Sequence, residues 1–319
     1  MIATVDLRSG DAAARLDDAI RRDGFVQLVG HGLDEAVGDA LWAGMDELFA
    51  LPREVKAHYV VDDPTANRGW RERGSEALSY SLGEASPPDL FESFNVGHDD
   101  RVAADTADLM APTPWPGEAP SFTAAIRAYL AEMVRLSAHL DEVLGGLIGV
   151  DDLAARSGRG PDTMACIRYE REASDGEVLP GQQRMGAHSD YTTFTILRAD
   201  PVPGLEILGN DGSWVPVIPE PGALLLNVGD VLAMWTNDTW PSTLHRVPPP
   251  PGNGAALRRS VAYFHYPDLD VEVAPLAAYA PNGSDYAPTT VRDHLAARLL
   301  GPKQHRPSTS TGTLAGRRI

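Results

Sequence analysis

The feature that most restricts the fold of this chain is a series of short apolar runs that begins after Gly158. The runs are rich in β-branched and aromatic residues, and Gly or Pro separates most of them from the next. They are TMACIRYE, TTFTILRA, GLEILG, SWVPVIP, ALLLNVG, VLAMWTN, TLHRVPP and RRSVAYFHYP. Many short strands with turn residues between them are typical of a barrel or a jelly roll. We therefore expect a β-rich core in the C-terminal half of the chain.

The first half of the chain predicts helices around a strand, helix and strand opening. IATVDL and FVQLV predict two strands, and the helix between them ends at Gly24. A second helix follows near DEAVGDALWAGMDELFAL and is closed by Pro52. From residue 122 to residue 147 apolar residues recur on one helical face. This spacing predicts one long amphipathic helix that packs against a sheet.

Charge and cysteine content exclude several classes of protein. The formal net charge is -18 and the pI is about 4.8, so a basic face for nucleic acid or an anionic membrane is not expected. The single Cys166 excludes a disulfide framework and a cysteine-rich zinc site, and it suits a reducing compartment. No apolar stretch approaches a membrane-spanning length, and the first residues lack a signal-peptide pattern. We expect a soluble cytoplasmic protein, and the oligomeric state stays open.

Three residues form a candidate metal site. His188 and Asp190 lie two positions apart in GAHSDYTTFTIL, whose composition predicts a strand, so both side chains are expected on one face. His245 in PSTLHRV, within another predicted strand, is the third candidate. Two His and one carboxylate form the facial triad of non-haem Fe(II) oxygenases, which leaves coordination positions open. The same set also suits catalytic zinc, as in a hydrolase.

A later predicted strand carries a candidate site for a carboxylate. In LRRSVAYFH, Arg258 and Ser260 share one face with small and aromatic residues, while Arg259 lies on the other face. A guanidinium binds a carboxylate through two parallel hydrogen bonds, a geometry that lysine does not offer. We expect Arg259 to form a solvated ion pair. Asn227 and Asp230 in NVGD are expected to shape a turn.

These motifs resemble a known family. HSD, STLHRV and RRSVAYF are similar to the His-x-Asp, His and Arg-x-Ser elements of the isopenicillin N synthase-like branch of Fe(II) and 2-oxoglutarate-dependent dioxygenases. DGFVQLVGHGL, FALPREVKAHY, RGWRERGSE and DLFESFNVG resemble its N-terminal and central segments. VPGLEIL, DGSWVPVIPEPGALLLNVGDVLAMWTND and YAPTTVRDHLAARL resemble its later strands and closing helix. The resemblance covers most of the chain.

The resemblance implies an α+β fold with a double-stranded β-helix (jelly roll) core and flanking α-helices, including the long helix that backs the sheet. We expect a single oxygenase domain over residues 1–301 and a poorly ordered tail over residues 302–319. Within the domain, the expected parts are a mixed α/β part (1–120), a helical middle (121–157), the jelly-roll core (158–275) and a closing helix region (276–301).

The resemblance also implies roles for particular residues. Fe(II) would be held by His188, Asp190 and His245, and the distal carboxylate of 2-oxoglutarate by Arg258 and Ser260, with O2 as the second cosubstrate. Tyr169 in IRYER is a further candidate for cosubstrate binding, although Ile167 stands where plant relatives have Asn. The candidates for the substrate pocket are Arg68, Tyr80, Phe91, Arg168, Tyr191 and Phe194, with Leu205 and Phe264 as pocket walls. The polar segment 173–186 is expected to form a lid.

The activity implied by the resemblance is oxidative decarboxylation of 2-oxoglutarate to succinate and CO2, coupled to hydroxylation, desaturation or cyclisation of a small molecule. An amino acid, a peptide-derived compound or another natural-product intermediate is the expected substrate. One alternative is an Fe(II) oxidase of the isopenicillin N synthase type, which needs no 2-oxoglutarate and turns Arg258 and Ser260 toward the substrate carboxylate. Another alternative, from a different class, is a jelly-roll binding protein without catalysis.

Overall fold

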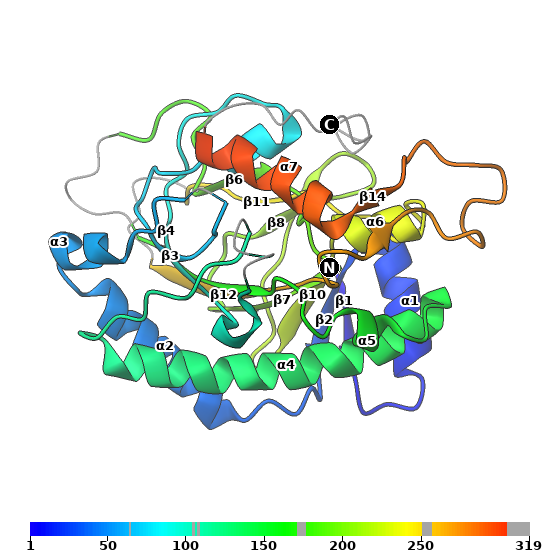
Figure 1. The fold of residues 1–319 in the computed structure, drawn as a ribbon, viewed down its shortest axis with the longest axis horizontal. Helices are drawn as coiled ribbons and strands as arrows, with labels where there is room; N and C mark the ends of the chain where they lie inside the picture. Colours follow the sequence, from blue (N-terminus) through cyan, green and yellow to red (C-terminus); the bar gives the residue numbers. More distant parts are fainter. Residues whose placement is uncertain (64, 104–105, 107–108, 171–176, 251–256, 305–319) are drawn as a thin grey trace.

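Two β-sheets face each other in the core of the protein, as the computed structural model shows (Figure 1). The structure describes residues 1–63, 65–103, 106, 109–170, 177–250 and 257–304. Within these residues the larger sheet has eight strands: β1 Ala3–Asp6, β2 Phe25–Val29, β10 Leu224–Val228, β7 Phe194–Ala199, β12 Arg258–His265, β5 Thr163–Tyr169, β4 Glu92–Gly97 and β3 Gly69–Arg71, in that order. The smaller sheet has the order β6 Met185–His188, β11 His245–Val247, β8 Glu206–Leu208 and β9 Trp214–Pro216.

Pairing within the sheets is antiparallel except between β1 and β2, which are parallel. Apolar side chains from both sheets meet between them, where Ile167 and Tyr169 of the larger sheet pack with Met185 and Val247 of the smaller. A short third pair joins β13 Glu272–Val273 to β14 Thr289–Thr290. The expected α+β fold with a jelly-roll core is confirmed.

Helices flank the two sheets, and the longest of them covers the outer face of the larger sheet. Their bounds are α1 Ala12–Asp23, α2 Glu35–Phe49, α3 Arg53–Lys56, α4 Pro120–Ile148, α5 Leu153–Arg156, α6 Asp230–Trp235 and α7 Val291–Gln304, with 3-10 turns η1 Ala57–Tyr59, η2 Leu78–Leu82 and η3 Asp99–Arg101. Figure 1 shows α4 running along one side of the molecule beside α2. Ile126, Met133 and Leu140 of α4 join Ile196 and Val261 of the sheet in one apolar core. The long helix predicted to pack against the sheet is confirmed.

The start and end of several elements follow local signals in the sequence. Gly24 ends α1 in the left-handed region at φ 65°, and its N–H donates to the carbonyl of Ile20. Pro52 follows α2 and stands at the N-cap of α3, where its missing N–H costs nothing. These residues therefore behave as the sequence predicts.

One predicted strand, VLAMWTN, is instead part of the helix α6. All six residues of α6 are buried, so its apolar run lacks the polar face that distinguishes a helix from a strand. Long-range contacts fix the helical turn, because the backbone N–H groups of Asp230 and Val231 donate to the carbonyls of Asp190 and Thr192. The strand prediction was wrong because tertiary contacts override the local pattern here.

The prediction of one strand through His188 and Asp190 was also wrong. β6 ends at His188, and Asp190 lies in the connection that leads to β7. The two side chains therefore approach each other across a strand end rather than along one strand face.

The C-terminal segment forms the closing helix α7, which contacts η2 and β14 and which Figure 1 shows in the upper part of the view. This helix extends to Gln304 and so enters the segment that was predicted as a tail. The rest of that tail, residues 305–319, lies outside the described residues, as do residues 173–176 of the predicted lid. The domain boundaries stay predictions.

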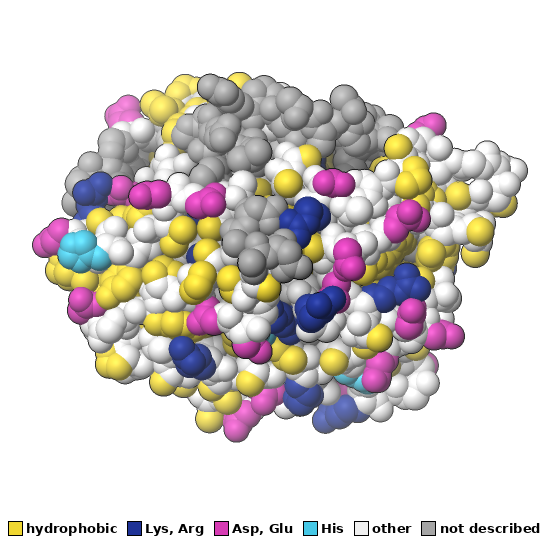
Figure 2. Space-filling model, viewed as in Figure 1, with side chains coloured by type: hydrophobic (Ala, Val, Ile, Leu, Met, Phe, Trp, Pro, Cys, Tyr) yellow, Lys and Arg dark blue, Asp and Glu magenta, His cyan; other side chains and the backbone are white. Residues whose placement is uncertain are grey.

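The acidic side chains are scattered over the face of the protein that Figure 2 draws. Figure 2 shows Asp and Glu side chains spread over one face among Lys, Arg and apolar side chains. In the part of the chain that the structure describes, no helix combines the length and the apolar character needed to cross a membrane.

Candidate active site

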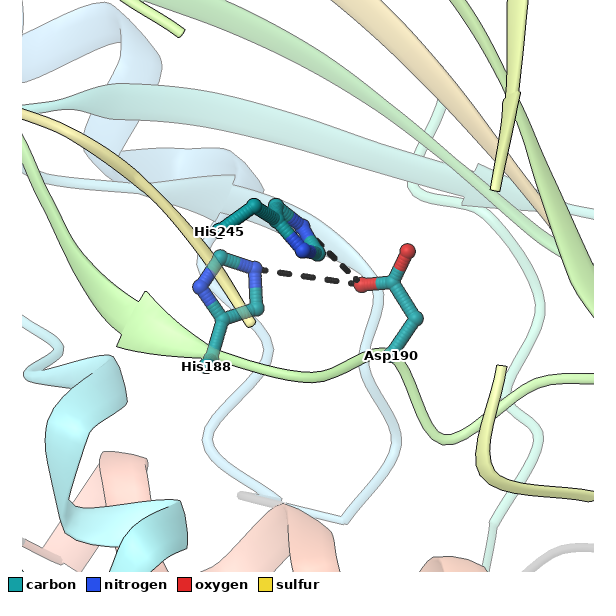
Figure 3. A group of neighbouring side chains, drawn as sticks. All are labelled: His188, Asp190 and His245. Atoms are coloured by element: carbon teal, nitrogen blue, oxygen red, sulfur yellow. Dashed lines mark ion pairs between the residues drawn. The ribbon is translucent and has the colours of Figure 1, made fainter. Parts of the chain in front are cut away.

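The structure brings His188, Asp190 and His245 together at the end of the smaller sheet (Figure 3). His188 and His245 are paired across β6 and β11, and their ring centroids lie 4.2 Å apart. The Nε2 atoms of His188 and His245 lie 3.8 and 3.7 Å from Oδ1 of Asp190. Among the described residues, this is the group of three whose ligand atoms lie within 4.8 Å of one another.

The hydrogen bonds of both imidazoles leave the nitrogen that faces the cluster free to bind a metal. Nδ1 of His188 contacts the carbonyl of Gly186 at 2.8 Å, and Nδ1 of His245 contacts the carbonyl of Thr243 at 3.2 Å. A carbonyl only accepts, so each Nδ1 carries the proton and donates it. Each Nε2 then presents its lone pair toward Asp190, as a metal ligand requires.

Hydrogen bonds also fix the orientation of the Asp190 carboxylate. Its Oδ2 accepts hydrogen bonds from Oγ1 of Thr195 at 2.6 Å and from Nδ2 of Asn227 at 2.7 Å. Oδ1 is thereby left facing the two imidazoles. Two nitrogen lone pairs and one carboxylate oxygen that converge in this way fit the facial triad of a non-haem Fe(II) site.

Burial keeps one ligand candidate neutral. It lowers the pKa of His188 to about 4, the adjacent His245 adds to the shift, and the Asp190 carboxylate opposes it. An imidazole that is unprotonated at neutral pH is the form that binds a metal ion.

Arg258, Ser260 and Tyr169 lie together on the inner face of the larger sheet. Arg258 pairs with Tyr169 across β12 and β5, and its guanidinium carbon lies 5.0 Å from the centre of the Tyr169 ring. Arg258 is 2% exposed, yet its Nε and Nη1 have no hydrogen-bond partner among the described residues. A buried guanidinium with unused donors is unfavourable unless an anion completes it, so this site fits a carboxylate.

The neighbour Arg259 lies on the opposite face, as predicted, but it is not solvated. It forms ion pairs with Asp46 at 2.7 Å and Asp200 at 3.1 Å, and its side chain is only 18% exposed. Its guanidinium lies 5.0 Å from the ring of Trp42, so the residue joins β12 to the helix α2.

A cavity of about 140 Å³ joins the His and Asp cluster to the Arg258 site. Five further predicted residues line it: Tyr169, Phe91, Tyr191, Leu205 and Phe264. The rings of Phe91 and Tyr169 are 6.3 Å apart. The cavity also reaches polar residues that the sequence did not single out, among them Glu76 and Asn95.

Four predicted pocket residues are not brought to this cavity. Phe194 is fully buried on the helix-facing side of the sheet, where it packs on His265 with ring centroids 4.8 Å apart. Arg168 alternates with Tyr169 onto the outer face and pairs with Glu170. Arg68 is 1% exposed and donates to Thr163 Oγ1 at 2.7 Å. Tyr80, in η2, is not among the residues that line the cavity.

The strand alternation accounts for two of these four corrections. In β7, Thr195 and Leu197 line the cavity, so Phe194 must face the other way. In β5, Ile167 and Tyr169 line the cavity, so Arg168 cannot. Once one residue of a strand is known to face the cavity, the alternation of side chains tells from the sequence which other residues face it.

The sequence reasoning missed the residues that support the metal ligands. Asn227 and Asp230 were expected to shape a turn, yet Asn227 lies inside β10 and donates to Asp190. Asp230 is fully buried and lies 3.1 Å from Nη2 of Arg298 in α7. The same guanidinium group donates to the hydroxyl of Ser189, which lies between His188 and Asp190. Local sequence patterns carry no signal for contacts between residues so far apart in the chain.

The fold and the three candidate ligands are those of a non-haem iron oxygenase. Comparison with known proteins supports the same class. The profile of the 2OG-Fe(II) oxygenase superfamily matches residues 161–267, and that of the non-haem dioxygenase in morphine synthesis N-terminal region matches residues 2–118. Validamycin A dioxygenase of Streptomyces hygroscopicus subsp. limoneus is 30% identical over 275 residues, which cover 84% of this chain and 75% of the relative. Flavanone 3-dioxygenase 2 of Oryza sativa subsp. japonica is 33% identical over 286 residues, which cover 86% and 76%.

A solved structure is similar over nearly the whole chain. The crystal structure of JOX2 in complex with 2OG, Fe and JA has a TM-score of 0.76 at 27% identity, and the match covers 94% of this chain and 86% of that one. The chain belongs to the 2OG-Fe(II) oxygenase superfamily, in its isopenicillin N synthase-like branch of plant and fungal dioxygenases. It is an Fe(II)- and 2-oxoglutarate-dependent dioxygenase, an oxidoreductase, so the hydrolase, non-catalytic and 2-oxoglutarate-independent alternatives are set aside.

Proposed function

We propose that this dioxygenase couples the decarboxylation of 2-oxoglutarate to oxidation of a C–H bond in a small organic molecule that binds in the cavity beside His188, Asp190 and His245. The observation that carries this proposal is the continuity of one cavity from these three residues to Arg258 and Ser260. Cosubstrate and substrate must meet at one metal ion, and this cavity offers room beside both groups of residues.

His188, Asp190 and His245 would hold Fe(II) through Nε2, Oδ1 and Nε2. Their hydrogen bonds to Gly186, Thr243, Thr195 and Asn227 fix these atoms before the metal binds, which reduces the reorganisation needed on binding. When bound, Fe(II) with 2-oxoglutarate would activate O2, and O2 is the oxidant for cleavage of a C–H bond, so the protein needs no acid or base at the reacting carbon.

Arg258 and Ser260 would bind the distal carboxylate of 2-oxoglutarate. Nε and Nη1 of Arg258 lack a partner, so a carboxylate would find an unused donor on this guanidinium, and the buried position strengthens the attraction. The aromatic ring of Tyr169 packs against the guanidinium and restricts its orientation. This part of the site would thereby place the keto acid end near the metal ligands.

The substrate is proposed to be an amino acid or another natural-product intermediate. Relatives bear the names validamycin A dioxygenase, flavanone 3-dioxygenase and proline hydroxylase, so this fold accepts varied small molecules. The walls of the cavity are mainly apolar and include Phe91, Leu205 and Phe264. Polar side chains interrupt these apolar walls at a few places. Apolar walls of this kind protect a reactive centre from water.

Anaerobic titration tests the roles of the two groups of residues. Fe(II) and 2-oxoglutarate added together are expected to give a weak visible charge-transfer band, and Asp190→Ala is expected to abolish it. A screen of small metabolites should then find compounds that stimulate succinate release and become oxidised themselves. Bound iron without the visible band in the unaltered enzyme would refute the proposed cosubstrate site.

A further inference from the structure

A polar group of residues lies at the edge of the larger sheet, apart from the metal ligands, and two of its three members line the same cavity. It comprises Arg71 at the end of β3, Glu76 in the segment after β3, and Asn95 in β4. Glu76 and Asn95 line the cavity. The strands β4 and β3 stand at one end of the sheet order, whereas β10, which carries Asn227, stands toward the other end. The cavity therefore runs from the metal ligands to this second polar group.

The strand register places Arg71 on the cavity side of the sheet. Arg71 is the direct antiparallel partner of Ser93, and Ser93 lines the cavity. Directly paired residues point to the same face, so Arg71 points toward the cavity as well. Its neighbour Trp70 faces the opposite side and belongs to the apolar core.

The polar atoms of this group are buried and incompletely bonded. Nε of Arg71 lies 3.8 Å from Oε1 of Glu76, which is longer than a hydrogen bond, and each side chain is 11% exposed. Among the described residues, Nε and Nη2 of Arg71, Oε1 of Glu76 and Oδ1 of Asn95 have no hydrogen-bond partner. Asn95 is only 6% exposed. Buried donors and acceptors in a native protein normally have partners, so a ligand is the natural complement.

The chemistry of these atoms specifies what the ligand carries. The free donors belong to a guanidinium and suit a carboxylate, while the free acceptors belong to a carboxylate and an amide and suit an ammonium group. A ligand with both charges leaves the buried site neutral, whereas a ligand with one charge leaves an unbalanced charge in a medium of low polarity. A zwitterion with adjacent charges matches the short distance between Arg71 and Glu76.

We propose that Arg71 binds the carboxylate, and Glu76 with Asn95 the ammonium group, of a free α-amino acid whose side chain extends toward His188, Asp190 and His245. This inference rests on the proposed function and narrows its substrate class. It accounts for the separation of the two polar groups, because one orients the amino acid and the other oxidises the side chain. Oxidation at a side-chain carbon, remote from the charged groups, follows from this orientation.

The test uses anaerobic enzyme loaded with Fe(II) and 2-oxoglutarate, with individual proteinogenic L-α-amino acids as the probes. Binding is read from a shift of the charge-transfer band and, independently, from thermal stabilisation. At least one amino acid is expected to bind and to stimulate succinate release in air. Its methyl ester, its N-acetyl derivative and its decarboxylated amine should each bind at least about tenfold more weakly, because each lacks one charge-assisted contact. Equal binding of these derivatives, or no binding by any of the amino acids, would overturn the inference.

Variants of the two charged residues locate the site. Arg71→Gln and Glu76→Gln should each weaken binding of the amino acid by about tenfold or more, with 2-oxoglutarate affinity retained. Glu72→Gln is the matched control, because Glu72 pairs with Arg53 in an exposed ion pair and is absent from the cavity lining. An unchanged charge-transfer titration shows that each variant is folded. The comparison of derivatives on the unaltered enzyme does not depend on any variant.

The outcomes separate this inference from the proposed function. Absence of the charge-transfer band refutes the cosubstrate site, and thermal stabilisation by amino acids still tests Arg71 and Glu76. A normal band together with succinate release driven only by compounds without an amino acid group refutes the inference alone.

Discussion

Arg298 in α7 donates a hydrogen bond of 2.8 Å from Nη2 to the hydroxyl of Ser189, the residue between His188 and Asp190. The same side chain donates from Nη1 to the carbonyl of Ser81 at 2.8 Å, and its guanidinium lies 4.9 Å from the centre of the Tyr191 ring. The closing helix therefore holds the connection that carries Asp190. We expect Arg298 to be a positioning residue that acts on the metal site through Ser189.

Replacing Arg298 should weaken both stability and metal binding. Arg298→Gln leaves the fully buried carboxylate of Asp230 without its guanidinium partner at 3.1 Å, so the free energy of unfolding should fall by about 3 kcal/mol. Loosening of Ser189 should also raise the apparent Kd for Fe(II). Chemical denaturation and metal titration measure the two effects. In the double variant with Asp230→Asn, the stability loss should be smaller than the sum of the single losses. An unchanged Kd for Fe(II) would limit Arg298 to a structural role.

The hydrogen bonds to Oδ2 of Asp190 should determine metal affinity. Asn227→Ala removes the 2.7 Å bond, and Thr195→Val removes the 2.6 Å bond while keeping nearly the same shape. Each change should weaken Fe(II) binding by about tenfold to hundredfold, as is usual for partners of metal ligands. Metal titration of the two variants, with Asn210→Ala as an exposed control, measures this. Wild-type affinity in both variants would contradict the role assigned to these residues.

Replacing Arg258 and replacing the adjacent Arg259 should have different effects on the KM for 2-oxoglutarate. Arg258→Lys keeps the charge but loses the planar pair of donors, so the KM for 2-oxoglutarate should rise by about tenfold or more. Arg259→Lys serves as the control, since Arg259 binds Asp46 and Asp200 on the outer face. Its effect should appear in stability rather than in KM. Succinate formation at varied 2-oxoglutarate concentration distinguishes the two variants, and equal KM values would argue against the carboxylate site.

The buried ion pairs of His265 with Asp141 and Asp162 should make the free energy of unfolding depend on pH. Burial alone would lower the pKa of His265, but the carboxylates of Asp162 and Asp141 outweigh it and raise the pKa to about 10. This raised pKa contributes stability that is fully present below the unfolded value of 6.5 and is lost as the pH rises through about 10. Chemical denaturation at a series of pH values should therefore show a falling free energy of unfolding over this range.

A variant isolates this group from other titrating residues. His265→Gln should lower the free energy of unfolding by about 3 kcal/mol near pH 6. The difference between the variant and the unaltered protein should shrink as the pH approaches 10. A difference that stays constant with pH would show that His265 is neutral in the folded protein. The charge of Asp162, whose pKa is held at about 2 mainly by His265 against the opposing effect of burial, should persist in mildly acidic solution.

The strands and the metal ligands could be predicted from the sequence because both depend on local features. Short apolar runs bounded by turn residues mark β5, β7, β10 and β12, and two His with one Asp form a recognisable donor set. α6 was misread because a short, fully buried helix has no polar face to reveal its period.

The wider site could not be predicted because it depends on contacts over long sequence separations. Arg298 meets Ser189 across 109 positions and Asn227 meets Asp190 across 37, and no local pattern encodes either contact. Arg68, Arg168 and Phe194 have residue types that suit a pocket, but the pleat and the position in the sheet turn them away from it. Glu76 and Asn95 lie in segments that resemble the family, but the sequence did not assign them to the site, and their place in it follows from the residues that line the cavity.

The position of Arg298 in the chain also bears on the order of assembly during translation. His188, Asp190 and His245 all leave the ribosome before α7 does, so the connection through Ser189 is held in place only after the helix docks. An iron ion that met the nascent chain would then find a looser site than the finished enzyme offers. If Arg298 acts on the metal site as expected, tight retention of iron would require a chain whose closing helix has been synthesised.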